Sequence, residues 1–157
     1  MKKTPTSTST RTLTSTPAPA TPASTLSDDQ MQALAQFFHD IAVEIAQVRL
    51  DAISAGAKLT DAPTVQLAGN VYSLMNISQG FALQSANLTL ANADQAVAEI
   101  STATQTADHA LDKLKNIDKA VNIASSVIVL AMAITTKDMG QIANAAKSVI
   151  IAAGVSV

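Results

Sequence analysis

The 157-residue sequence contains no cysteine and no tryptophan, and it has few aromatic and few charged residues. Without cysteine the chain has no disulfide, no thiolate metal site and no thiol nucleophile. Charged residues make up 14% of the chain, which is well below the average of about 25% for soluble domains. Because charge normally keeps domains dispersed, this composition favours self-association.

Several functions are excluded by what else the sequence lacks. Its net charge is -2, whereas binding to nucleic acid requires clustered Lys and Arg. The sequence has no Gly-rich phosphate loop, no paired-His metal spacing and no local Ser, His and Asp signature. We therefore predict that the protein is not an enzyme. We expect no catalytic or metal-binding residue, no cofactor, no small-molecule substrate and no nucleic-acid partner.

The first 27 residues are almost entirely Thr, Ser, Pro and Ala, and their only charges are Lys2, Lys3 and Arg11. They contain no apolar stretch, so they are not a secretory signal, although the composition imitates an organelle transit peptide. Such a segment buries too little apolar area to offset its ordering entropy. We predict that residues 1–27 form a disordered tail, which could serve as a spacer, an export signal or a target for modification.

Residues 28–119 are predicted to be helical. Ser27 is a helix-capping residue ahead of an apolar-periodic stretch that runs to about Ala55. Apolar residues in this stretch recur at alternating spacings of four and three, the repeat of a coiled-coil seam. They are Leu34, Phe38, Ile41, Ile45, Val48 and Ala52. Gly56 supplies a stop, and Thr60 or Asp61 with Pro63 in the first turn supplies a restart, so a helical hairpin is expected.

The second predicted helix repeats the same spacing but places hydroxyl groups at some of its positions. Its seam is Leu67, Val71, Leu74, Ser78, Phe81, Ser85 and Leu88. Gly69 and Gly80 lie inside it, and glycine in a helix costs about 1 kcal/mol relative to alanine, which indicates close approach by a partner helix or a local break. The spacing continues from Val97 to Ala131 without an obvious stop. If unbroken, this helix would approach seventy residues and about 100 Å.

The last part of the chain, residues 120–157, is more apolar. It is predicted to form a hairpin from a first arm ending at Ile134, a turn over residues 135–140 and a last helix from Gln141 to Ala153. Each arm is about fifteen residues, shorter than the roughly 20 that span a bilayer. The pattern therefore favours a core or interface hairpin, with membrane contact through residues 120–153 as the alternative.

Between Asp61 and Asp94 no side chain is charged, yet the interval contains many amides. They are Gln66, Asn70, Asn76, Gln79, Gln84, Asn87 and Asn92. A surface helix would carry charges, and a membrane span would exclude amides because each requires a hydrogen-bonding partner in hydrocarbon. The interval is therefore predicted to pack against neighbouring subunits, where amides hydrogen-bond side by side.

The run from Leu59 to Leu74 resembles the R-body structural proteins, the refractile-body or killing-trait family. Those small chains carry a similar order of Asp-Ala-Pro, apolar turn, Gly-Asn, apolar residue and Tyr, here from Asp61 to Tyr72. The charge-poor segment from Gln79 to Asn92 and the Thr/Ala/Gln-rich residues 101–107 are also similar to that family. The resemblance covers about residues 50–107. The N-terminal tail and the apolar hairpin are additions to the compact family members.

The resemblance implies a subunit of an insoluble bacterial ribbon that coils in the cytoplasm. Acid would extend the ribbon into a hollow needle, without nucleotide, and the needle would rupture a membrane and release toxic contents. The expected partners are further copies of the chain and related small R-body subunits, with the membrane as mechanical target. The residues expected at the assembly interface are Pro63, Leu67, Gly69, Asn70, Val71, Tyr72, Leu74, Gly80, Phe81 and Leu88.

The uncharged interval has no titratable group except Tyr72, so a response to acid must come from its borders or from the two histidines. His109 lies between Asp108 and Asp112, whose carboxylates repel at i,i+4 spacing until one is protonated. The alternative is that each histidine is simply solvated or hydrogen-bonded. The candidate pH-sensing residues are His39, Asp61, Asp94, Glu99, Asp108, His109 and Asp112.

The predicted fold class is all-α, with a long helical hairpin with heptad-like seams, a C-terminal apolar helical hairpin, and assembly into a polymer. The leading functional hypothesis is a ribbon subunit. A membrane-active helical pore-forming or translocator protein is the first alternative, and it predicts that soluble protein causes liposome leakage. A cytoplasmic helical adaptor is the second, and it predicts a discrete soluble oligomer at neutral pH.

Overall fold

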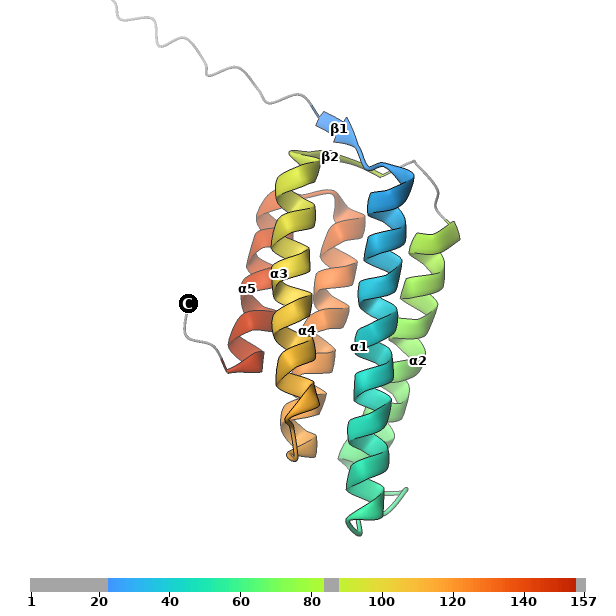
Figure 1. The fold of residues 1–157 in the computed structure, drawn as a ribbon. Coiled ribbons are helices and arrows are strands. Elements are labelled where there is room, and N and C mark those ends of the chain that lie inside the picture. Colours follow the sequence, from blue (N-terminus) through green and yellow to red (C-terminus); the bar gives the residue numbers. More distant parts are fainter. Residues whose placement is uncertain (1–22, 84–87, 155–157) are drawn as a thin grey trace, which may run out of the picture.

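The computed structural model describes residues 23–83 and 88–154, which form five helices and a two-stranded antiparallel sheet (Figure 1). The helices are α1 (Asp28–Ser54), α2 (Ala62–Leu83), α3 (Ala93–Asp112), α4 (Ile117–Thr136) and α5 (Met139–Ala153). The strands are β1 (Ala23–Thr25) and β2 (Thr89–Ala91), with Ser24 opposite Leu90. The predicted helical character of the chain is confirmed.

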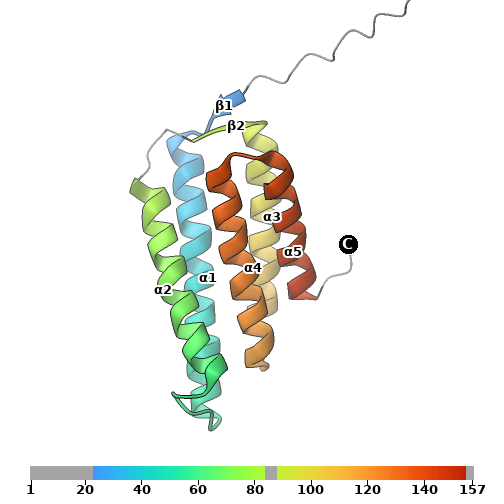
Figure 2. The ribbon, with the colours of Figure 1, turned by 180° about the vertical axis from the view of Figure 1, so that it is seen from behind.

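The helices form an up-and-down bundle in which α4 contacts all four of the others. Helix α2 packs on α1 and α4, and α5 packs on α3 and α4. As a result α2 and α5 occupy opposite edges of the bundle (Figures 1 and 2). The short sheet crosses one end of the bundle, above the start of α1 and α3 (Figure 1).

Local sequence signals explain how α1 begins and ends. The Ser27 hydroxyl accepts a hydrogen bond from the Gln30 amide at 3.2 Å, and the Gln30 side chain accepts one from the Ser27 amide at 2.9 Å. This reciprocal pair satisfies two backbone donors that the helix start leaves free. At the other end, Gly56 takes a left-handed conformation with φ of 107°. Both predicted boundaries of the first helix are confirmed to within one residue.

The predicted seam of α1 lies in the core from Leu34 to Val48, and Ala52 at its end is only partly buried. Leu34, Phe38, Ile41 and Ile45 have almost no exposed surface, and Phe38 stacks on Phe81 of α2 with ring centroids 5.4 Å apart. The core also includes Leu26, whose amide donates to the Leu88 carbonyl at 2.9 Å. Residues 23–27 are therefore part of the folded structure, so the prediction of a disordered tail is wrong for these five residues. Residues 1–22 lie outside the described part.

The continuous helix of nearly seventy residues is not formed. Helix α2 ends at Leu83, and α3 begins after Asn92, which has a left-handed φ of 60°. Residues 113–116 then separate α3 from α4. Between α2 and α3 the chain buries Leu88 and Leu90 and pairs β2 with β1. The chain buries these leucines across the end of the bundle, and this interrupts the continuous helix that heptad spacing alone predicted.

The apolar last part of the chain forms α4 and α5, with a short turn between them. Asp138 caps α5 by accepting hydrogen bonds from the amides of Gly140 and Gln141 at 2.8 and 3.2 Å. The first arm is longer than expected, because α4 contains 20 residues. In the described part of the chain, α4 is the one helix whose length and composition would suit a membrane span. Half of its apolar segment is buried inside the bundle. The hairpin contributes to the same core as α1, α2 and α3.

Candidate assembly interface

Helix α2 stands at the edge of the bundle, and none of its 22 residues is charged. Its inner side is held by Leu67, Leu74 and Phe81, which are buried, and by Ser78, whose hydroxyl donates to the Ala35 carbonyl of α1 at 2.8 Å. The Arg49 guanidinium of α1 donates to the Thr64 carbonyl at 3.0 Å. These contacts fix the rotation of α2 about its own axis, so one side faces away from the rest of the chain.

The structure divides the predicted interface residues into two groups. Leu67, Leu74, Phe81 and Leu88 are enclosed in the core of their own chain, which leaves them no surface for a neighbouring subunit. The other predicted residues lie at least partly at the surface. They are Pro63, Gly69, Asn70, Val71, Tyr72 and Gly80, among which Gly69 and Tyr72 are exposed and the other four are partly buried.

A second seam runs along the exposed side of α2. We call it the α2 stripe, and it consists of Val65, Gly69, Tyr72, Asn76, Gln79 and Leu83. All six are exposed and follow one another at spacings of four, three, four, three and four, the repeat of a helix that packs against another helix. The exposed fraction is 71% for Tyr72 and 84% for Leu83. Helix α2 thus has one seam that packs on its own chain and another that has no partner among residues 23–83 and 88–154.

The glycines of α2 are not required by the fold of the single chain. A Cβ atom built on Gly69 or on Gly80 would meet no heavy atom within 4 Å. Both residues also have ordinary helical backbone angles, so neither is held by a left-handed conformation. Each costs about 1 kcal/mol of helix stability relative to alanine. The packing of the described residues therefore gives no reason for a residue without a side chain at Gly69, within the α2 stripe.

The charged residues gather on the side of the bundle formed by α1 and α3. Asp40 and Glu44 of α1 face Asp108 and Asp112 of α3, and burial together with these three carboxylates raises the pKa of Glu44 above its ordinary value of 4.5. By contrast, α2, α4 and α5, which are seen together in Figure 2, contain only Asp118, Lys119 and Lys147 as charged residues. The molecule therefore has an acidic side and a nearly uncharged side.

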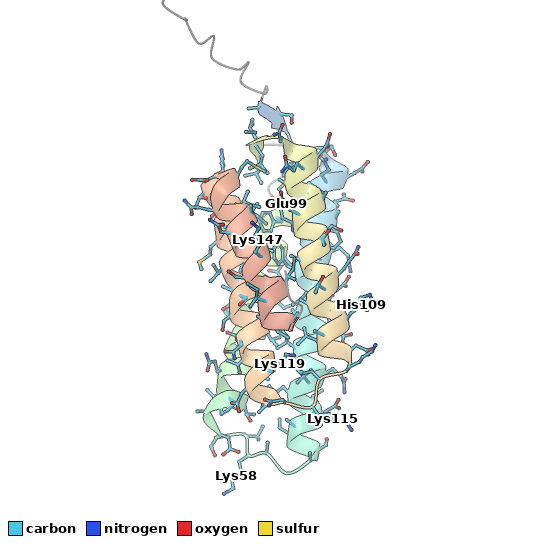
Figure 3. The ribbon with its side chains drawn as sticks, turned by 90° about the vertical axis from the view of Figure 1, so that its left-hand side faces the viewer. Lys58, Glu99, His109, Lys115, Lys119 and Lys147 are labelled. Atoms are coloured by element: carbon cyan, nitrogen blue, oxygen red, sulfur yellow. The ribbon has the colours of Figure 1, made fainter. Side chains whose placement is uncertain are left out.

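The structure brings two of the predicted pH-sensing residues, Asp108 and Asp112, into this acidic cluster, together with Asp40 and Glu44, which the sequence reasoning missed. Asp40 and Glu44 are spaced i,i+4 on α1, as Asp108 and Asp112 are on α3. This shared spacing is the signal that could have identified Asp40 and Glu44. The histidines are both exposed, and His109 points away from the bundle (Figure 3).

The remaining predicted pH-sensing residues are dispersed. Asp61 accepts a hydrogen bond from the Lys58 amide at 2.8 Å, and Asp94 accepts one from the Gln30 side chain at 3.0 Å. Glu99 lies in a hollow of about 410 Å³ between α3 and α5, across from Lys147 (Figure 3). One Glu99 oxygen accepts from Gln95 at 3.0 Å, and the other is buried without a partner.

Nothing in the described residues assembles the ligand set of a metal ion. No family model, curated protein or solved structure matches the chain. The resemblance to R-body proteins therefore rests on the run from Asp61 to Tyr72 itself, which spans the turn before α2 and the first half of that helix.

Proposed function

We propose that the protein is a structural subunit of a self-assembling bacterial ribbon of the R-body type. The ribbon coils in the cytoplasm as an insoluble inclusion and extends on acidification to rupture membranes and release toxic contents. The observation that supports this proposal best is the α2 stripe, an uncharged, exposed helical seam at the edge of the bundle. Copies of this chain and related small subunits are the partners that such a seam fits.

The chemistry of the α2 stripe favours protein over lipid as its partner. Asn76 and Gln79 lie within it, and an amide in hydrocarbon would lose its hydrogen bonds to water at a cost of several kcal/mol. Against a second helix, the same amides pair with each other. Tyr72 likewise combines an apolar ring with a hydroxyl that requires a partner when buried.

A membrane-active helical protein is the second candidate, and the observation that favours it is α4. Its 20 residues are long and apolar enough to cross a bilayer. However, α4 contacts all four other helices, so insertion would require the bundle to open. The α2 stripe needs no such rearrangement, and for that reason the ribbon is the preferred function.

The acidic cluster supports a link between acid and shape. Protonation of Glu44 removes repulsion between α1 and α3, so acid favours the arrangement in which these helices are in contact. A polymer changes form on acidification when its two subunit arrangements differ in proton affinity. Since the cluster lies on α1 and α3, it would act on the packing within a subunit and leave the α2 stripe chemically unchanged.

Electron microscopy of the insoluble fraction tests this proposal. The wild-type chain, expressed alone and with its genomic neighbours, is expected to form ribbons or rolls at neutral pH and a changed form in acid. Val65→Lys introduces a charge into the α2 stripe and is expected to reduce the pelleted fraction at least tenfold, since burying an unpaired charge costs several kcal/mol.

Leu50→Lys on α1 is the matched control, because Leu50 is 52% exposed and Val65 is 55% exposed. It is expected to leave assembly intact. The ribbon proposal would be wrong if the wild-type chain stayed in the supernatant as a small, discrete oligomer both alone and when expressed with its genomic neighbours. Leakage from liposomes exposed to that soluble protein would favour the membrane-active alternative.

A further inference from the structure

A second uncharged seam runs along the exposed side of α4. We call it the α4 stripe, and it consists of Asn122, Ser125, Val129, Met132 and Thr136. Its spacings are three, four, three and four, the same repeat as in the α2 stripe. Val129 is 49% exposed and Met132 is 53% exposed, although both belong to the most central helix of the bundle. Two large apolar side chains therefore project from α4 with no covering segment in the described part of the chain.

The surface beside these side chains is hollowed on both sides. Between α2 and α4 there is a hollow of about 140 Å³, which is bounded by Ile77, Gly80 and Met132 among others. Between α4 and α5 there is a second hollow of about 370 Å³, bounded by Met132, Asn144 and Ser148 among others. Met132 borders both hollows and so forms a ridge with a groove on either side.

We infer that the α4 stripe is a second self-association surface, on which another copy of this chain packs α4 against α4 about a two-fold axis. The ridge of Val129 and Met132 on each copy enters a hollow beside the ridge of the other. Gly80 fits this arrangement, because its missing side chain leaves open the hollow between α2 and α4. This inference rests on the proposed ribbon function and specifies how subunits connect within it.

A second copy fits this surface better than lipid or an unrelated charged partner. Ridge and groove occur on the same face, so the face is complementary to itself in shape. It is also free of charge, so two copies meet without repulsion, whereas two acidic sides would bring Glu44 and Asp108 against their equivalents. The Asn144 amide would be unpaired in hydrocarbon, and it finds a partner across a protein contact. The hydroxyls of Ser148 and Thr136 are compatible with either surrounding, because they already donate to the carbonyls of Asn144 and Ala133 at 3.0 and 2.7 Å.

Two such surfaces per subunit account for a polymer. A single self-complementary contact closes on itself and yields a dimer. A subunit with one contact through the α2 stripe and another through the α4 stripe connects to two neighbours, and the subunits form an open chain when the two-fold axes of the two contacts do not intersect. The two stripes lie on different helices, α2 and α4 (Figure 2). Both helices border the hollow beside Gly80.

Charge insertion into each stripe tests this connection. Val129→Lys is expected to convert the pelleted polymer into soluble dimers joined through the α2 stripe, and Val65→Lys is expected to leave dimers joined through the α4 stripe. The double variant is expected to be monomeric. Val43→Lys on α1 is the matched control, because Val43 is 46% exposed on the acidic side, and it is expected to polymerise as the wild type does. Sedimentation and light scattering give the masses.

A cysteine cross-link keeps the test decisive where Val129→Lys fails to fold. The chain has no cysteine, so Val129→Cys introduces a single thiol, which a short bis-maleimide is expected to join to its equivalent in assembled protein. Val43→Cys is expected to stay uncross-linked. Two results would overturn the second surface while leaving the ribbon proposal intact, provided that the wild-type chain forms ribbons. The first is that Val129→Lys protein still polymerises, and the second is that Val129→Cys protein forms no cross-link. A wild-type chain that stays monomeric would overturn both.

Discussion

At the scale of single residues, Thr64 is the clearest test of how α2 is seated. Its side chain is fully buried, and its hydroxyl oxygen has no hydrogen-bond partner. Thr64→Val replaces the hydroxyl with a methyl group of similar size. We expect the free energy of unfolding to rise by about 1 kcal/mol, because an unsatisfied buried polar group is removed. The change is measured by thermal denaturation monitored by circular dichroism, with Thr64→Val made in the soluble Val65→Lys background.

Ser78 on the same helix provides the control. Its hydroxyl is also buried, but it donates to the Ala35 carbonyl. Ser78→Ala is therefore expected to lower the free energy of unfolding by about 1 kcal/mol. A Thr64→Val variant that is destabilised like Ser78→Ala would show that the Thr64 hydroxyl has a partner in solution.

At the scale of the helix, Gly69 separates the stability of the chain from its assembly. Gly69→Ala is expected to stabilise the subunit by up to about 1 kcal/mol, since alanine favours the helix and the new methyl group has open space. The same methyl group would stand in the α2 stripe and hold a partner helix away, so the protein concentration needed for assembly is expected to rise. Unfolding and pelleting assays on one preparation measure both effects.

Thr102→Ala on α3 is the matched control for this variant. Thr102 is an exposed helical residue outside both stripes, and alanine there also improves helix propensity. We expect a gain in stability with unchanged assembly. If Gly69→Ala assembles as readily as Thr102→Ala does, then no partner backbone approaches Gly69.

A comparison of α1 with α2 shows which parts of the fold can be predicted from the sequence. The start of α1 depends on neighbouring residues, Ser27 and Gln30, and such local chemistry was predictable. The seam of α2 through Leu67, Leu74 and Phe81 was predictable as well, but its partner was not. The uncharged sequence of α2 indicated neighbouring subunits, whereas the packing of Ser78 and Phe81 on α1 shows that this seam belongs to the core of its own chain.

At the scale of the whole molecule, the acidic side makes stability depend on pH. The folded state raises the pKa of Glu44 above 4.5, so it binds the proton more tightly than the unfolded chain does. The stabilisation from this group is therefore complete below pH 4.5 and is lost as the pH rises through the folded pKa. Glu44→Gln mimics the protonated form, so we expect it to be more stable than the parent chain at neutral pH and equal to it in acid.

Thermal unfolding between neutral pH and pH 4 measures this difference in the soluble Val65→Lys background. Asp51→Asn, two turns further along α1, is the control. At neutral pH its stability is expected to differ little from that of the parent chain. An equal response of both variants would mean that general charge reduction, rather than the contact between α1 and α3, sets the effect. The cluster itself could not be predicted, because its four carboxylates come from helices separated by all of α2, and only tertiary packing unites them.

The separation of charge between the two sides of the bundle also determines how ionic strength acts on the protein. Dissolved salt screens the mutual repulsion of the carboxylates on α1 and α3 over distances of about 10 Å at 0.1 M. It has no charge to screen on the α2 stripe or the α4 stripe. Salt that dissolves assemblies held by ion pairs would therefore leave the proposed ribbon intact, whereas cooling, which weakens contacts between apolar surfaces, would loosen it.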